Sequence, residues 1–210
     1  RMRAFMGRSA TFSMPNKKAA YELTHAVFYL SEYGRRDPHL GCEVKKSLEF
    51  IGLLAFLEQN ADLLAEVCVA MRHSGMPVPE MWDTWLLRHT SLFDVECGDR
   101  VAQQDDYHEF LVCNWAMAAA GKAPFNKAFE AGRMGFFRPE AIGGPLRELS
   151  EIMYRLDDNR SGDWGAMRPV VLDGLSPDAQ VIMACAEKST NVFEEFFEGF
   201  ARANAMAGAM

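Results

Sequence analysis

The stretch that decides the fold runs Tyr21-Glu22-Leu23-Thr24-His25-Ala26-Val27-Phe28-Tyr29-Leu30-Ser31-Glu32-Tyr33-Gly34. On a helical wheel its aliphatic residues gather on one side, as expected for a stripe that faces the core. The opposite side carries large rings beside an imidazole and two carboxylates, where a surface helix would carry Lys, Glu and Ser. The residues of that side are Tyr21, Glu22, His25, Phe28, Tyr29 and Glu32. The sequence therefore predicts a helix whose second face is buried or forms the wall of a pocket.

Both ends of this helix carry the expected signals. Ser13 is suited to the N-cap with Pro15 in the first turn, and Gly34 is suited to the position after the C-cap. Glu22 precedes His25 by one helical turn, so the two side chains can touch.

Composition and charge narrow the class of protein. The chain has 210 residues, enough for one domain or two small ones with a real core, and its 49% hydrophobic and 24% charged residues are typical of a soluble globular protein. The net charge of −7 argues against nucleic acid or an anionic membrane surface as a partner. The longest apolar run, Phe50 to Leu57, is far shorter than the roughly 20 residues that a membrane span needs.

Cysteine usage and the first residues predict a cytoplasmic location. The five cysteines are widely spaced and form no C-x-x-C pair, which favours reduced, buried thiols over disulfides or a zinc knuckle. Arg1, Arg3 and Arg8 are not followed by an apolar segment, so we expect no secretory signal. Because the chain begins with Arg, we expect part of the N-terminus to be missing.

Glycine and proline divide the sequence into helices, and no segment shows the alternation of a strand. We expect an all-α protein with a single domain, residues 1–210, of about eight helices. The architecture would be an irregular helical bundle or a partial α/α toroid. Within it, residues 1–12 would form an N-terminal arm, 157–175 a long loop, and 176–210 a C-terminal helix with a break near Thr190.

A second concentration of reactive side chains lies in Asp105-Asp106-Tyr107-His108-Glu109. Asp105 precedes His108 by one turn, as Glu22 precedes His25. Two helices with a carboxylate and a histidine on one face can build a metal site in a helical bundle. Glu22, His25, Asp105 and His108 would then bind a transition metal (Fe, Mn or Zn).

The same residues fit two metal-free interpretations. In one, His25 and His108 are catalytic acid–base groups oriented by Glu22 and Asp105. The substrate pocket would be lined by Tyr21, Tyr29, Tyr107, Trp115 and Asn114. In the other, both histidines are core residues with hydrogen-bonded rings, and Asn114 is a structural bracket for the backbone. The sequence leaves these alternatives open.

The C-terminal segment places phenylalanines on one side of a helix and glutamates on the other. The rings of Phe193, Phe196, Phe197 and Phe200 must be buried, since burying one Phe yields about 1.5–3 kcal/mol. They pack either on the chain's own core or against a homodimer or protein partner.

The Glu22-Leu23-Thr24-His25 box, with Phe28 to Gly34 after it and Tyr107-His108 later, resembles a family of uncharacterised all-helical bacterial proteins of unknown function. The resemblance implies a helical fold and a common role for the two histidines, but no activity. We therefore expect a soluble bacterial enzyme with a small-molecule pocket around His25 and His108. The alternative is a non-catalytic helical interaction module or homodimer that uses the phenylalanine-rich helix.

Overall fold

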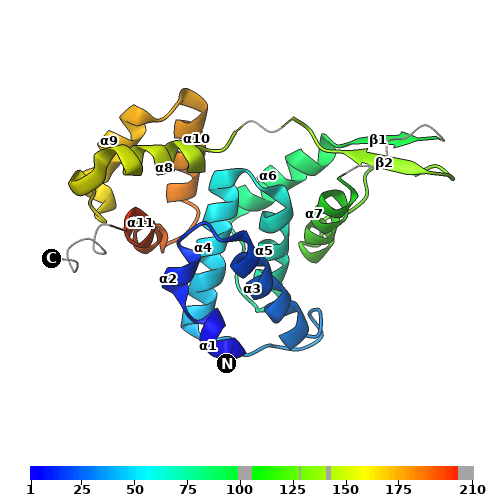
Figure 1. Cartoon of the computed structure of the whole chain (residues 1–210). Coiled ribbons are helices and arrows are strands. Elements are labelled where there is room, and N and C mark those ends of the chain that lie inside the picture. The colour runs from blue at the N-terminus through cyan, green and yellow to red at the C-terminus, as the bar shows by residue number, and fades with distance from the viewer. Residues whose placement is uncertain (99–105, 128, 141–142, 203–210) are drawn as a thin grey trace.

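The computed structural model describes residues 1–98, 106–127, 129–140 and 143–202 (Figure 1). Within these ranges the chain forms eleven α-helices, one 3₁₀ turn and a two-stranded ribbon, which confirms the all-α fold class. The α-helices are α1 (Met2–Met6), α2 (Ser9–Phe12), α3 (Lys17–Leu30), α4 (Cys42–Glu58), α5 (Ala61–His73), α6 (Glu80–Ser91), α7 (Tyr107–Ala119), α8 (Pro145–Leu156), α9 (Trp164–Gly174), α10 (Pro177–Glu187) and α11 (Phe193–Ala201).

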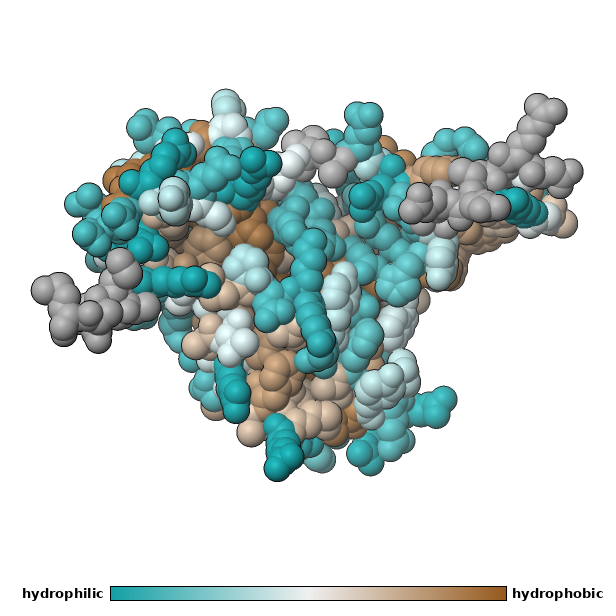
Figure 2. Space-filling model, viewed as in Figure 1, coloured by the Kyte–Doolittle hydropathy of each residue, from teal (hydrophilic) through white to brown (hydrophobic). Residues whose placement is uncertain are grey.

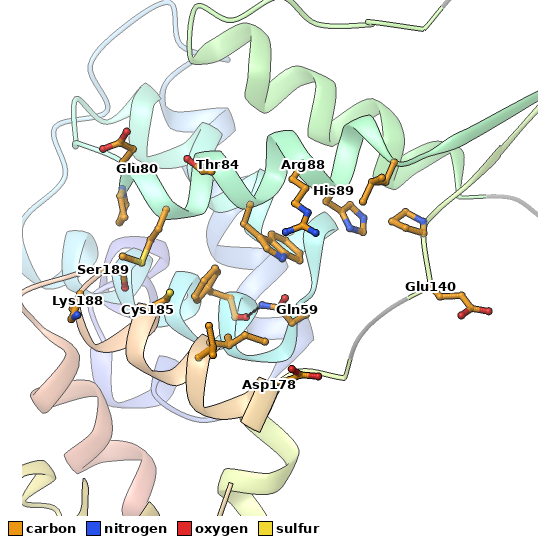
Figure 3. Close-up of a pocket in the computed structure, with 18 residues that line it drawn as sticks. Gln59, Glu80, Thr84, Arg88, His89, Glu140, Asp178, Cys185, Lys188 and Ser189 are labelled. Atoms are coloured by element: carbon orange, nitrogen blue, oxygen red, sulfur yellow. Dashed lines mark hydrogen bonds between the residues drawn. The ribbon is translucent and has the colours of Figure 1, made fainter. Parts of the chain in front are cut away.

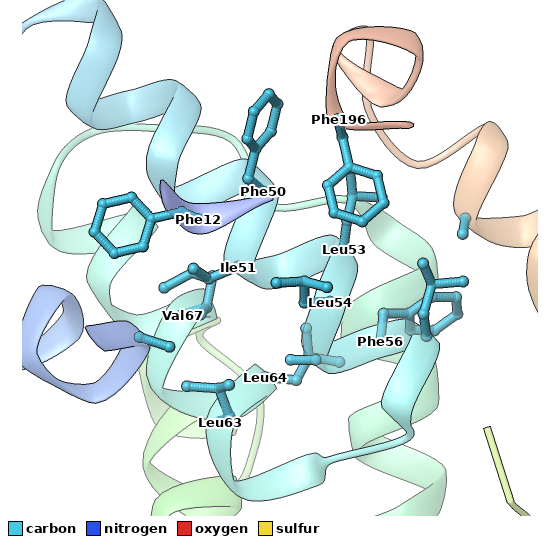
Figure 4. Close-up of a cluster of buried hydrophobic side chains, with 14 of the residues drawn as sticks. Phe12, Phe50, Ile51, Leu53, Leu54, Phe56, Leu63, Leu64, Val67 and Phe196 are labelled. Carbon is cyan, nitrogen blue, oxygen red and sulfur yellow. The ribbon is translucent and has the colours of Figure 1, made fainter. Parts of the chain in front are cut away.

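The α4–α5 hairpin forms the centre of the molecule. Gln59 ends α4 in the left-handed conformation, and the Asn60 side chain accepts a hydrogen bond from the Leu63 N–H to begin α5. α5 packs against α3, α4, α6 and α7, so it is enclosed on most sides. Aliphatic and aromatic side chains fill the space around the hairpin (Figure 4). Gly52 allows the close packing of α6, because a Cβ there would lie 2.3 Å from the Trp82 ring.

The predicted opening helix is present as α3, but its start was predicted too early. Asn16, and not Ser13, is the N-cap, and its Oδ1 accepts from the Ala19 N–H at 3.1 Å. Ser13 is buried and donates instead to the Ala10 carbonyl. Gly34 has a φ of 84°, and a Cβ there would lie 2.7 Å from the His73 ring, so the chain turns closely over α5.

The predicted N-terminal arm and the predicted loop 157–175 both contain helices. Residues 1–12 form α1 and α2, which pack against α4. The predicted loop 157–175 is wrong for most of its length: it contains a 3₁₀ turn (Asp157–Asn159) and α9. Asp163 caps α9 by accepting from the Ala166 N–H, and Pro169 lies inside the helix. Residues 176–202 form α10 and α11, divided near Thr190 as predicted.

A small antiparallel ribbon was not predicted. β1 (Asp94–Cys97) pairs with β2 (Met134–Phe137) in the register Asp94 to Phe137 and Cys97 to Met134. The strands are too short to show a periodic pattern, and their pairing joins distant parts of the sequence. In Figure 1 the ribbon projects away from the helical body. Phe110 of α7 stacks on Phe136 with ring centroids 4.8 Å apart and so anchors the ribbon to the helices.

The C-terminal helices α8 to α11 form the other end of the molecule, seen on the left in Figure 1. The four phenylalanines of α11 named above are buried in the chain's own interior, with Phe50 and Trp164 among their neighbours. These rings are therefore not displayed for a partner, and a homodimer stays a prediction. Hydrophilic residues cover much of the face in Figure 2. None of the helices in the described ranges is both long and apolar enough to span a bilayer.

All of the cysteines are free thiols, but the prediction that they are buried holds for only two. Cys68 and Cys113 are buried, and burial raises the pKa of both thiols. The Sγ of Cys113, on α7, lies 3.8 Å from the Ala61 carbonyl oxygen at the start of α5. Cys42 and Cys97 are exposed.

Candidate functional site

Two carboxylates on α5, Asp62 and Glu66, each contact one of the two predicted histidines, which lie on the neighbouring helices α7 and α3. His108 of α7 has its Nδ1 2.7 Å from Asp62 Oδ1. His25 of α3 has its Nε2 3.5 Å from Glu66 Oε1. Because Asp62 and Glu66 are one helical turn apart, they lie on the same face of α5. α5 therefore brings both histidines to one row of carboxylates.

Of the two carboxylates predicted to accompany the histidines, only Glu22 lies among the described residues, and it is not the ion-pair partner of His25. Glu22 lies 4.0 Å from Lys18 in an exposed pair on α3, and His25 contacts Glu66 instead. Asp105 lies outside the described residues. Among the residues that are described, no group of three or more His, Cys, Asp or Glu side chains has the arrangement of a metal site.

Asp62 is fixed by two donors. The Tyr21 hydroxyl donates to Asp62 Oδ2 at 2.6 Å, while His108 occupies Oδ1. Burial raises the pKa of the Tyr21 phenol, and the hydrogen bond to the Asp62 carboxylate raises it further. Tyr21 therefore remains a neutral donor that holds Asp62 in position for His108.

Glu66 lies deeper, with only 3% of its surface exposed. The Thr24 hydroxyl donates to Glu66 Oε2 at 2.5 Å. Burial raises the pKa of Glu66, and the contacts with Thr24 and His25 oppose that rise. Glu66 thus joins α3 to α5 inside the molecule.

A cavity of about 500 Å³ opens beside Asp62. Tyr21, Asp62 and His108 line one side of it, and α6, α7 and the end of α4 complete it. His25 is not among the described residues that line this cavity. Of the two predicted histidines, only His108 can therefore meet a molecule bound there.

A second histidine does line this cavity and was missed by the sequence reasoning. His89, on α6, has its Nε2 2.7 Å from Glu109 Oε1, and both side chains are nearly buried. Arg138 lies beside them, with Nη1 3.4 Å from Glu109 Oε2, and its backbone N–H donates to Asp106. Glu109 follows His108 directly in the sequence, but nothing in the local pattern pairs it with His89 on another helix.

The other predicted pocket residues lie around the site in different settings. Tyr29 is 66% exposed and packs edge-on against Tyr33. Tyr107 is exposed and has its ring at right angles to that of His108. Trp115 packs against Phe28, Tyr33 and His73 and is not among the described lining residues of the cavity.

Asn114 has the environment expected of a structural bracket. It is buried, its Nδ2 donates to the Phe110 carbonyl at 2.8 Å, and its Oδ1 accepts from the Phe125 N–H. Its amide thus joins α7 to the segment that follows it.

Comparison with known proteins places the chain in a family. Residues 1–203 match the model described as "Domain of unknown function (DUF6902)", and the chain belongs to this family. No curated protein and no solved structure matches the chain significantly. The description of this family gives no activity, which agrees with the resemblance to uncharacterised helical proteins noted from the sequence. That the Glu22–His25 and Tyr107–His108 boxes are typical of the family stays a prediction.

Proposed function

We propose that this member of the DUF6902 family is an enzyme that performs acid–base chemistry on a small molecule bound in the cavity beside Asp62. His108 would accept a proton from the substrate, and Asp62 would orient the ring. The observation that carries the proposal is the placement of two histidine–carboxylate pairs, His108–Asp62 and His89–Glu109, on one cavity.

The geometry of the first pair suits a general base. A carboxylate facing Nδ1 favours the tautomer that carries its proton there, which leaves Nε2 with a lone pair. Tyr21 holds the second oxygen of Asp62, so this carboxylate cannot turn away from the ring. Histidine is also the side chain that enzymes use most often to transfer protons to and from a substrate.

The second pair would supply the opposite role. His89 and Glu109 are close and largely shielded from water, and Arg138 adds a positive charge beside them. A shielded histidine held by a carboxylate can return a proton to the product. Two such groups facing one volume allow removal and delivery of a proton without movement of the helices.

The test is a comparison of His108→Gln and Asp62→Asn with His39→Gln. His39 is a matched control because its Nδ1 lies 3.2 Å from Asp37 in an exposed pair that does not line the cavity. The purified proteins would be incubated with a bacterial metabolite extract, and consumption would be followed by mass spectrometry. We expect wild type and His39→Gln to consume the same compound, and the two site variants to be slower by about 10²-fold or more.

Two results would overturn the proposal. One is an unchanged metabolite profile with wild-type protein across the extract. The other is equal consumption by His108→Gln. Thermal unfolding of each variant provides the check on folding, and we expect little change for His108→Gln because that side chain is 61% exposed.

A further inference from the structure

A larger, mostly apolar groove adjoins the cavity. It lies between α6 and α10 and has a volume of about 920 Å³ (Figure 3). Among its polar residues, Glu80, Thr84 and Arg88 lie on α6, Cys185 lies on α10, and Lys188 and Ser189 follow the end of α10; all six are labelled in Figure 3. The floor and sides are formed by Phe56, Met81, Trp85, Leu92, Val181 and Ile182.

The groove and the cavity share two residues. Gln59 and His89 line both of them. The His89 ring stacks on Trp85, with centroids 5.2 Å apart and an interplanar angle of 23°. The segment at Arg138 and Pro139 also passes from the cavity to the groove. A molecule bound along the groove would therefore have one end at His89.

The charges where the groove meets the cavity favour one kind of end group on a bound molecule. The cavity is lined by more carboxylates than permanent cations: Glu58, Asp62, Asp106 and Glu109 against Lys17 and Arg138. The groove repeats the imbalance, with Glu80, Glu140 and Asp178 against Arg88 and Lys188. Lys17 is paired with Glu58 at 3.0 Å and Arg138 with Glu109 at 3.4 Å, which still leaves carboxylates in excess of permanent cations in the cavity. A carboxylate or phosphate end group would therefore meet like charge, whereas a positively charged end group would be attracted.

We infer that the substrate is an apolar amine, with a hydrocarbon or aromatic body in the groove and its amino group at His89 in the cavity. This inference rests on the proposed function, because the amino end is placed where the two histidine pairs face each other. The large apolar volume provides the binding energy, and the carboxylates determine the polarity of the end group.

The test uses three probes of equal chain length: octylamine, 1-octanol and sodium octanoate. Titration calorimetry with the full chain should give tighter binding for octylamine than for octanol, and binding of octanoate weaker than that of octylamine by about tenfold or more. Octanoate binding as tightly as octylamine would overturn the inference, as would the absence of binding by all three.

A variant pair tests the location. Val181, on α10, is 65% exposed and lines the groove, so Val181→Trp should narrow it without disturbing the core. Val170, on α9, is 45% exposed and does not line the groove, so Val170→Trp is the matched control. We expect Val181→Trp to weaken octylamine binding by about tenfold, and Val170→Trp to leave it unchanged. Equal binding by both variants would place the probe elsewhere and overturn the inference.

The two proposals fail in distinguishable ways. Metabolite turnover that depends on His108, together with no preference for octylamine, would refute the inference that the substrate is an amine but would leave the proposed enzymatic function in place. Turnover that persists in His108→Gln would refute the proposed function whatever the probes do.

Discussion

Asp62 and Glu66 are one turn apart on the same helix and each contacts a histidine, yet their surroundings differ. Asp62 lies on the edge of a cavity, holds His108 at 2.7 Å and accepts from the Tyr21 hydroxyl. Glu66 is closed off by α3, holds His25 at 3.5 Å and accepts from Thr24. The same pair of residue types can therefore orient a reactive ring at one position and join two helices at the next.

The difference follows from what covers each carboxylate. Glu66 faces the middle of α3, where Thr24 and Phe28 are both buried. Asp62 is near the first turn of α5, where α4 ends and the cavity begins. A carboxylate at a helix start is also stabilised by the helix dipole, whereas one in mid-helix is not. We expect stability to depend on Glu66 and chemistry on Asp62.

The largest effect on stability should come from Glu66→Ala. This change leaves a void and removes the Glu66 carboxylate to which Thr24 donates, so that the Tyr21 carbonyl at 3.0 Å is the acceptor left to this hydroxyl. The free energy of unfolding should fall by about 2 kcal/mol. Asp62→Ala, at a more accessible position, should cost about 1 kcal/mol or less. Urea denaturation of both variants measures the contrast. A larger loss for Asp62→Ala would reverse the assignment of roles.

A smaller effect should appear in the pH dependence of stability. Burial raises the pKa of Glu66 above its ordinary 4.5, so the folded state binds a proton more tightly than the unfolded state. Stability from this group is complete below pH 4.5 and is lost as the pH rises through the folded value. Relative to Glu66→Gln, which does not titrate, wild type should therefore lose stability across that window. The measurement is urea unfolding of both proteins at a series of pH values, and a difference that stays constant would contradict it.

The smallest effect should come from Glu22→Gln. Glu22 forms an ion pair with Lys18 at 4.0 Å on an exposed face, and such pairs contribute about 0–1 kcal/mol. Stability and metabolite consumption should both stay close to wild type. A loss of turnover as large as that of Asp62→Asn would restore Glu22 to the catalytic role that the sequence suggested.

Much of the fold could be predicted because helical periodicity is local. The spacing of Leu23, Val27 and Leu30 is enough to identify α3, but the choice between Ser13 and Asn16 as its cap is decided by what buries Ser13. α9 was missed because Gly165 and Pro169 disfavour a helix, whereas Asp163 and the burial of Trp164 and Met167 stabilise it.

The site was predictable on one side only. Of the expected site residues, His25 does not line the described cavity, whereas Tyr21 and His108 do. Tyr21 and His108 were singled out from their own helices, because unusual side chains on a helical face are visible in sequence. Their partners were not, because Asp62 is 41 residues from Tyr21 and 46 from His108, and only the packing of α5 brings them together. His89 was missed for the same reason, since Glu109 lies on a different helix.

The rate at which the buried Cys113 thiol reacts with a reagent reports on the packing of α7 against α5. Its sulfur is enclosed between α7 and the start of α5, the helix that carries both carboxylates. A disulfide reagent can reach this sulfur only when the two helices separate locally, so the labelling rate of Cys113 depends on how often that opening occurs. Cys42 and Cys97, which are exposed, would react first and give the reference rate for accessible thiols. A ligand bound beside Asp62 should then slow the labelling of Cys113.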